Sequence, residues 1–221
     1  MSLTILIVCA ALFVATHIGL SGLAVKAALE KRLGAGAAKG LYALLSLLTF
    51  GGMILPYAFF GARGEALWAP LGWDNALVWI LMILSFLFIA YSMATPSPVG
   101  ADMGKPVKPE ARGMLRVTSH PQNMGMLCFG LAHVLVTGTV GGLALYGSFA
   151  VLPLIGSWHE TAKTRRSADP AVQAFLKETS PLPFAAIISG RNHLVLGEFA
   201  LPTLLIAAVV AGAAVGLHFL L

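Results

Sequence analysis

Six runs of apolar residues alternate with polar stretches along the chain. The runs cover roughly residues 3–25, 41–62, 74–95, 120–138, 141–159 and 197–220. A helix crosses the hydrocarbon core of a bilayer with about 20 apolar residues, and five of the runs meet or nearly meet that length. The run at about 141–159 is interrupted by Pro153. The pattern predicts an all-α fold, a polytopic membrane bundle of about six transmembrane helices in a single domain over residues 1–221.

Two connections between the runs have features of their own. Gly138 and the pair Gly141 and Gly142 separate the fourth and fifth runs almost without polar residues, which predicts a tight turn between antiparallel helices. The longest polar segment, at about 159–196, includes the apolar stretch PLPFAAIISG, whose two prolines make it too short and broken to span a membrane. We expect this loop to be cytoplasmic and its apolar stretch to lie in the membrane interface or to re-enter a cavity.

Composition and charge agree with a membrane location and indicate an orientation. Hydrophobic residues make up 58% of the chain, charged residues 10%, and the mean hydropathy is +0.86, whereas a soluble domain has about 25% charged residues. Thirteen of the 14 Lys and Arg residues follow the first, third and fifth runs, and Arg63 alone follows the second. Positively charged loops stay in the cytoplasm, so we expect both termini on the non-cytoplasmic side of a bacterial inner membrane. The net charge of +5 is thus an orientation signal, and no nucleic-acid partner is expected.

Histidines are the titratable residues within or at the ends of the runs. Four of them are candidates for a site, namely His17, His120, His133 and His218, and no Asp, Glu, Lys or Arg lies in the middle of a run. A proton-coupled transporter usually needs such a carboxylate, so this class is disfavoured. The two cysteines, Cys9 and Cys128, lie inside apolar runs, which favours buried small hydrophobes over a disulfide or a metal pair.

The surroundings of these histidines differ. His17 and His133 each share a helix face with small residues such as Ala10 and Thr137, which leaves space for a flat macrocycle whose iron binds imidazole nitrogens. The alternative is that each histidine simply hydrogen-bonds a neighbouring helix. His120 precedes Pro121, and because proline is favourable at the first helical position, it is predicted to cap a helix. For His218 we expect a position at the interface.

Three separated motifs resemble the NnrU family, and in particular its 15-cis-zeta-carotene isomerase branch. They are THIGLSGLA, VTSHPQNMGMLCFGLAHVLVTG and TSPLPFAAIISGR, at residues 16–24, 117–138 and 179–191. The resemblance implies a membrane protein that carries haem b, with His17 and His133 as its axial iron ligands and catalytic residues. In the isomerase branch it implies that ferrous haem isomerises the 15-cis double bond of a lipid-soluble carotenoid without net oxidation. The bacterial branch is associated with nitric oxide metabolism and denitrification, which implies a gaseous substrate instead.

The sequence departs from the isomerase branch at two places. Three residues before the second proposed ligand, the plant-type isomerases have a cysteine that takes part in ligand exchange, and Gly130 stands there in this chain. The isomerases also carry a histidine pair in the fifth helix, where this chain has Leu152 and Pro153. Both departures weaken the expectation of isomerase activity more than the expectation of haem binding.

Depth in the membrane complicates the ligand assignment. His17 lies about 12 Å from the inner end of its run and His133 roughly 20 Å from the start of its own, although two ligands of one iron must share a depth. His120, at the inner end, is therefore a rival partner for His17. Asn123, Arg116 and Arg191 are further candidate cofactor-binding residues, because amide and guanidinium groups suit the carboxylates of haem.

Two other functions remain open from the sequence. A His-Pro pair followed by a small residue, Gly125, also begins the cofactor motif of membrane methyltransferases that use S-adenosylmethionine. Those enzymes usually have an arginine where this chain has Ser119, and the acidic residues Glu160 and Glu178 are poorly placed to hold that cofactor. A non-enzymatic subunit that assists assembly of a respiratory complex is the third hypothesis, since ligand histidines look the same in a subunit and in an enzyme.

Overall fold

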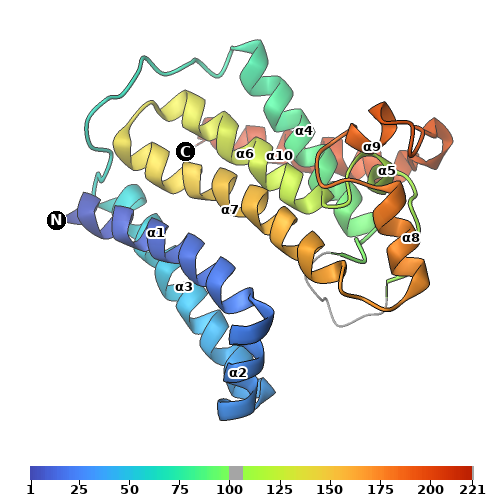
Figure 1. Cartoon of the computed structure of the whole chain (residues 1–221). Helices are drawn as coiled ribbons and strands as arrows, with labels where there is room; N and C mark the ends of the chain where they lie inside the picture. Colours follow the sequence, from blue (N-terminus) through green and yellow to red (C-terminus); the bar gives the residue numbers. More distant parts are fainter. Residues whose placement is uncertain (100–106, 221) are drawn as a thin grey trace. The chain divides into compact units, whose positions relative to one another are not determined.

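The protein is described by a computed structural model that covers residues 1–99 and 107–220, without the side chains of residues 21, 23, 24 and 218–220. Within these residues it is helical and has no β-strand, apart from one isolated bridge between Ala66 and Thr139 (Figure 1). The elements are α1 (Ser2–Ser21), α2 (Leu23–Leu33), α3 (Ala35–Phe59), α4 (Ala76–Ala94), α5 (Met114–Val117), α6 (Pro121–Thr137), α7 (Val140–Thr164), α8 (Pro170–Glu178), α9 (Ala185–Ile188), the 3-10 turn η1 (Leu196–Glu198) and α10 (Leu201–Leu220). The predicted all-α fold is confirmed.

Each of the six predicted apolar runs contains a helix. Four of these helices, α1, α3, α4 and α7, are long and apolar enough to cross a membrane, whereas α6 has 17 residues and the described apolar part of α10 is Leu201–Leu217. Many apolar side chains of these helices point outward, such as Leu47 with 68% and Val209 with 71% of its surface exposed. Exposed apolar surface on this scale is typical of helices that contact lipid.

The structure corrects the first and fifth runs. The first run is not one helix, because the extended backbone of Gly22 (φ −62°, ψ 135°) ends α1 and a separate helix, α2, follows. The fifth is not interrupted, because α7 continues for 25 residues with Pro153 inside it. Proline is tolerated within apolar helices where neighbouring groups satisfy the freed carbonyl. The interfacial position expected for His218 falls outside the described side chains.

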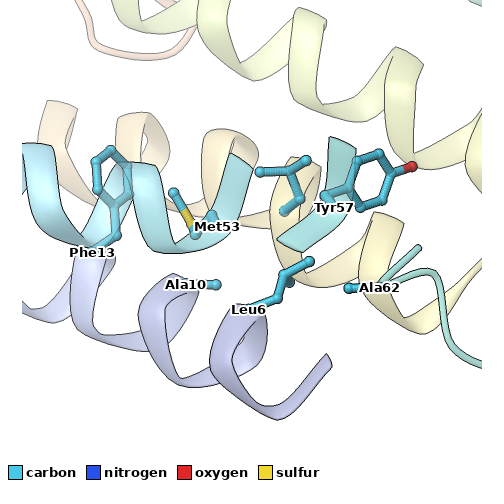
Figure 2. Packing of buried hydrophobic residues seen from close by; sticks show 7 residues of the cluster. Leu6, Ala10, Phe13, Met53, Tyr57 and Ala62 are labelled. Carbon is cyan, nitrogen blue, oxygen red and sulfur yellow. The ribbon is translucent and has the colours of Figure 1, made fainter. Parts of the chain in front are cut away.

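The chain divides into two compact units. Unit 1 comprises residues 1–79 and 129–155, and unit 2 comprises residues 80–128 and 156–221. Three helices, α4, α6 and α7, contribute a segment to each unit, so no linker separates them. In unit 1, α1 and α3 lie side by side (Figure 1). Its core is a cluster of buried apolar residues, most of which Figure 2 labels: Leu6, Ala10, Phe13, Met53, Tyr57, Ala62 and Leu145.

Two glycines set the geometry of the α6–α7 pair. At Gly130, a Cβ atom would lie 2.7 Å from both the backbone nitrogen of Ala150 and the carbonyl oxygen of Tyr146, so only glycine fits between the helices. Gly138 has a φ of +61°, which L side chains rarely adopt, and it forms the predicted tight turn into α7. The N–H groups of Leu67 and Leu71 donate to the carbonyls of Gly138 and Leu135, at 2.7 and 3.0 Å, and so cap the end of α6.

In unit 2, an ion pair connects α5 to the segment before α10. Arg116 donates from Nε and Nη2 to the two carboxylate oxygens of Glu198, at 2.7 and 2.8 Å. The backbone N–H of Gly113 donates to the same carboxylate at 2.6 Å. These donors, Arg116 first, lower the pKa of Glu198 from 4.5 to about 2, and the same bond raises the pKa of Arg116. Forked arginine–carboxylate pairs of this kind are strong and directional.

A methyl group at position 130 tests the close approach of α6 and α7. We expect Gly130→Ala to destabilise the folded protein by about 2 kcal/mol, because the added carbon meets backbone atoms that cannot rotate away. The matched control is Gly147→Ala in α7, where the added carbon meets only Leu143 Cδ1 at 3.5 Å. Thermal unfolding in detergent compares the two variants, and equal melting temperatures would refute the tight contact.

The Arg116–Glu198 pair predicts a dependence of stability on pH. Because the pKa of Glu198 is lowered in the folded state, its contribution is complete above about 4.5, its ordinary value, and is lost as the pH falls through about 2. Glu198→Gln should cost about 2 kcal/mol at neutral pH and flatten the unfolding profile in that acidic window. Glu110→Gln is the control, since within residues 1–99 and 107–220 the ion pair of Glu110 is with the exposed Lys108, at 3.4 Å. An unchanged acidic profile in Glu198→Gln would show that another carboxylate is responsible.

Candidate functional site

His17 lies in the C-terminal half of α1 and is anchored to its own helix. Its Nδ1 donates to the carbonyl of Phe13 at 2.8 Å, and its ring packs on the ring of Phe13 with 4.2 Å between centroids. Since a carbonyl oxygen can only accept, the proton sits on Nδ1 and the lone pair on Nε2. A long contact of 3.5 Å joins Nε2 to the hydroxyl of Ser46 in α3.

His133 in α6 repeats this arrangement. Its Nδ1 donates to the carbonyl of Phe129 at 2.9 Å, and the side chain is buried. The imidazole lies 4.0 Å from the ring of Phe129 and is stacked on Tyr146 at 4.7 Å, while Trp73 meets its edge at 5.5 Å. A neutral His133 therefore also carries its lone pair on Nε2.

The donor chemistry of this pair suits a haem iron. Metal-binding histidines almost always donate from the second ring nitrogen to a carbonyl or carboxylate, which fixes the tautomer and the ring orientation. The carbonyls of Phe13 and Phe129 fill that role for His17 and His133. Among the described residues no group of three or more His, Cys, Asp or Glu side chains forms a metal site, but haem needs protein ligands only at its two axial positions.

The two imidazoles belong to one aromatic cluster in unit 1. Phe149 of α7 connects them, with its ring 6.2 Å from Phe13 and 6.1 Å from Phe129. Any macrocycle ligated by both histidines would have to lie among these phenylalanine rings. The two predicted ligand residues thus belong to one aromatic cluster without contacting each other, and they come from helices that are more than 100 residues apart in the sequence.

The difference in depth that the sequence indicates is present in the structure. Ser148 of α7 contacts Met53 of α3 at 3.6 Å, and this contact serves as a common reference level. On α7, His133 stacks on Tyr146, which lies two residues before Ser148. On α3, His17 approaches Ser46, which lies seven residues before Met53. The N–H of Gly141 at the start of α7 donates to the carbonyl of Arg63 just after α3, so the two helices are antiparallel and these separations add. At 1.5 Å per residue, the imidazoles are offset by roughly 13 Å along the helix axes. Two imidazoles on one iron lie closer together than this, so one iron can take both only if α1 shifts along its axis.

His120 belongs to a different environment, in unit 2. Its side chain is 3% exposed, its Nε2 lies 2.8 Å from the hydroxyl of Thr161, and its Nδ1 lies 3.3 Å from a carboxylate oxygen of Glu160. Its carbonyl accepts from the N–H of Met124 at 3.0 Å, and α6 begins at Pro121 as predicted. Both ring nitrogens are engaged, so iron ligation by His120 would disrupt this cluster.

Glu160 lies beside His120. From the sequence, it was judged poorly placed to hold S-adenosylmethionine, and its contact with His120 was not predicted. The signal that identifies it is the register of the α6–α7 hairpin. Residues at similar distances from the turn at Gly138 face each other, as Asn123 does when it donates to the hydroxyl of Ser157 at 3.1 Å. His120 and Glu160 pair by the same register.

The predicted carboxylate-binding residues all have partners within unit 2. Arg116 is bound to Glu198 and donates to Asn192 at 2.8 Å, and Arg191 donates to the carbonyls of Lys177 and Thr179, at 2.9 and 3.0 Å. Their predicted contact with haem stays a prediction. Three aromatic residues were not predicted for this site: Trp73 and Tyr146, which contact His133, and Tyr57, which contacts Tyr146.

Gly125, the small residue of the methyltransferase hypothesis, has a packing role. A Cβ atom there would lie 2.6 Å from the side chain of Ile89 and 3.0 Å from the carbonyl of Ser85, both in α4. The space beside Gly125 is therefore filled by a helix. The two cysteines are free, as predicted, and both are partly buried.

Comparisons with known proteins place the chain in a family. The family model described as NnrU protein matches residues 5–221. The 15-cis-zeta-carotene isomerase, chloroplastic, of Arabidopsis thaliana is 31% identical over 209 residues, which are 91% of this chain and 56% of that protein. Its Zea mays counterpart is 29% identical over 185 residues, with 83% and 50% covered. The chain spans about half the length of these relatives, and no solved structure gives a significant match. The chain belongs to the NnrU family.

Proposed function

We propose that this protein is a membrane-embedded haem b protein that isomerises 15-cis-zeta-carotene or a closely similar carotenoid. The observation that carries the proposal is the matched anchoring of His17 and His133, each through Nδ1 to a carbonyl of its own helix, within one aromatic cluster. Membership of the NnrU family, and two relatives named as 15-cis-zeta-carotene isomerases, supply the substrate class.

In this proposal, His17 and His133 hold the iron through Nε2, and haem, when bound, supplies a redox-active metal that can interact with a polyene. The contact of 3.5 Å between the Ser46 hydroxyl and His17 Nε2 would be lost, because the same nitrogen would bind the iron. The rings of Phe13, Phe129 and Phe149 exclude water and offer an apolar surface to the polyene. Gly130 has no side chain, so any exchange of iron ligands in this protein proceeds without a thiol at that position.

The lipid-soluble substrate fits the surface of the helices. Side chains such as Leu47, Leu205 and Val209 expose large apolar areas, and a carotenoid dissolved in the bilayer reaches such a surface without crossing water. We propose a membrane location with both termini on the non-cytoplasmic side, from the distribution of Lys and Arg. The two relatives are named as chloroplast proteins.

Histidine substitution tests the ligand assignment. After expression with added haem, we expect the purified protein to show a Soret band, and His17→Ala and His133→Ala each to lose haem or change its spin state. A six-coordinate low-spin spectrum indicates both ligands, and a five-coordinate high-spin spectrum indicates that the offset of roughly 13 Å persists and only one histidine binds. His193→Ala, at an exposed residue, is the control. A wild-type protein without a Soret band contradicts haem binding.

His120→Ala distinguishes the rival ligand. We expect it to lower the melting temperature, because it leaves the buried Thr161 and the partly buried Glu160 without their partner, and to change the haem spectrum less than the other two substitutions. A larger spectral change in a variant that melts like the wild type would assign the iron to His120.

Complementation tests the activity. In carotenoid-producing cells blocked at 15-cis isomerisation, the wild type should restore the downstream carotenoid. His17→Ala and His133→Ala should each reduce its amount by at least about tenfold, which corresponds to about 1.4 kcal/mol of activation free energy. Pigments are separated by chromatography in the dark, since light isomerises them. Haem-loaded protein that accumulates in the membrane but restores nothing would indicate a non-enzymatic haem subunit.

A further inference from the structure

We propose that Arg63 and the hydroxyl of Tyr57 form an anion-binding site beside His133, and that this site takes a carboxylate of haem. The inference rests on the proposed function and adds the residues that orient the cofactor. The proposed iron ligands remain His17 and His133. For the haem carboxylate, we propose Arg63 and Tyr57 of unit 1, which also contains both histidines, in place of Arg116 and Arg191 of unit 2.

Arg63 is a cation held in a defined position. Its guanidinium carbon lies 3.9 Å from the centre of the Tyr57 ring, while the side chain is exposed. Among the described residues it forms no ion pair, although Glu65 is two positions along the chain. A guanidinium stacked on an aromatic face keeps its edge donors available, and these match the two oxygens of a carboxylate. Arg116, by contrast, is neutralised by Glu198.

Tyr57 provides an independent observation. Only 6% of its surface is exposed, and its hydroxyl is buried with no hydrogen-bond partner among the described residues. Figure 2 shows the hydroxyl directed away from the side chains of Leu6 and Met53, at the far end of the ring from the apolar cluster. Buried hydroxyls in native proteins nearly always have a partner, so an unpaired one indicates a ligand or water that belongs there. The indole Nε1 of Trp68, in the loop after Arg63, is a second buried donor without a described partner.

Ring contacts connect this pair to the proposed iron ligand. Tyr57 meets Tyr146 edge to face at 5.6 Å, and Tyr146 stacks on His133 at 4.7 Å. The first turn of α7 starts beside Arg63, whose carbonyl accepts from the N–H of Gly141 at 2.7 Å. The positive end of that helix therefore adds to the field of the guanidinium. A planar ligand on His133 that extends past Tyr146 would bring an acidic group to Arg63.

The test uses full-length protein loaded with haem in nanodiscs, and it measures the rate at which haem transfers to excess apomyoglobin. Arg63→Gln should release haem about tenfold faster, as loss of one charge-assisted hydrogen bond implies, and should lower the reduction potential, because the unpaired carboxylate favours ferric iron. Arg63→Lys should lie between it and the wild type. Arg32→Gln, which removes an exposed cation of α2, should behave as the wild type.

Tyr57→Phe separates a ligand-binding role from a structural one. Removing a buried hydroxyl that has no partner should leave the melting temperature of the haem-free protein unchanged or raise it. If the hydroxyl donates to haem, the same variant should nevertheless release haem several-fold faster. A structural role would instead lower the melting temperature and leave haem release unchanged, and that result would overturn the assignment of Tyr57.

A lipid phosphate has the same oxyanion chemistry and is distinguished by native mass spectrometry of the same samples. If Arg63→Gln keeps haem at the wild-type rate and potential but loses co-purified phospholipid, the site is a lipid site and the proposal is wrong. If the wild type binds haem and neither variant alters its release, the inference fails and the proposed function stands. If the wild type binds no haem, the proposed function fails as well.

Discussion

The contact between α6 and α7 at Gly130 determines where His133 lies. With no side chain at this position, the backbones approach until a Cβ atom would touch Ala150 and Tyr146. Within unit 1, the contact fixes the register of the two helices, and this register stacks His133 on Tyr146. A shift by one residue along either helix would rotate its side chain by about 100° away from its partner. The position of the His133 imidazole therefore depends on a glycine, which has no side chain.

The same contact explains a difference from the isomerase branch that the sequence resembles. A cysteine at position 130, as in the plant-type isomerases, requires wider spacing of the two helices than this chain has. Its absence is thus linked to packing around His133, and a cysteine substituted for Gly130 would not fit unless α6 or α7 moved. The proposed iron site of this protein is surrounded by Phe129, Tyr146 and Trp73, an apolar environment without a neighbouring thiolate.

Features that depend on local chemistry were predictable from the sequence. The apolar runs predicted the helices, Pro121 predicted the start of α6, and Gly138 predicted the turn, because each reflects the conformational preferences of the residues themselves. The break at Gly22 was missed, since glycine is compatible with both helix and extended backbone and the apolar run continues past it. The pairing of Glu160 with His120 and the stacking of Arg63 on Tyr57 depend on helix register and side-chain rotation, which hydropathy does not encode.

The histidines show how an apolar helical bundle separates two uses of the same side chain. The N–H group of an imidazole that is shielded from water needs a hydrogen-bond acceptor in the protein. The nearest one is the carbonyl four residues earlier in the same helix, which accepts from the imidazole in addition to its helical N–H donor. His17 and His133 use this acceptor, each through Nδ1, and their rings also contact residues of neighbouring helices. His120 instead spans α6 and α7, with a partner at each nitrogen. The contact at Nε2 is what differs between His120 and His17, because His120 Nε2 lies 2.8 Å from the hydroxyl of Thr161, whereas His17 Nε2 lies 3.5 Å from the hydroxyl of Ser46.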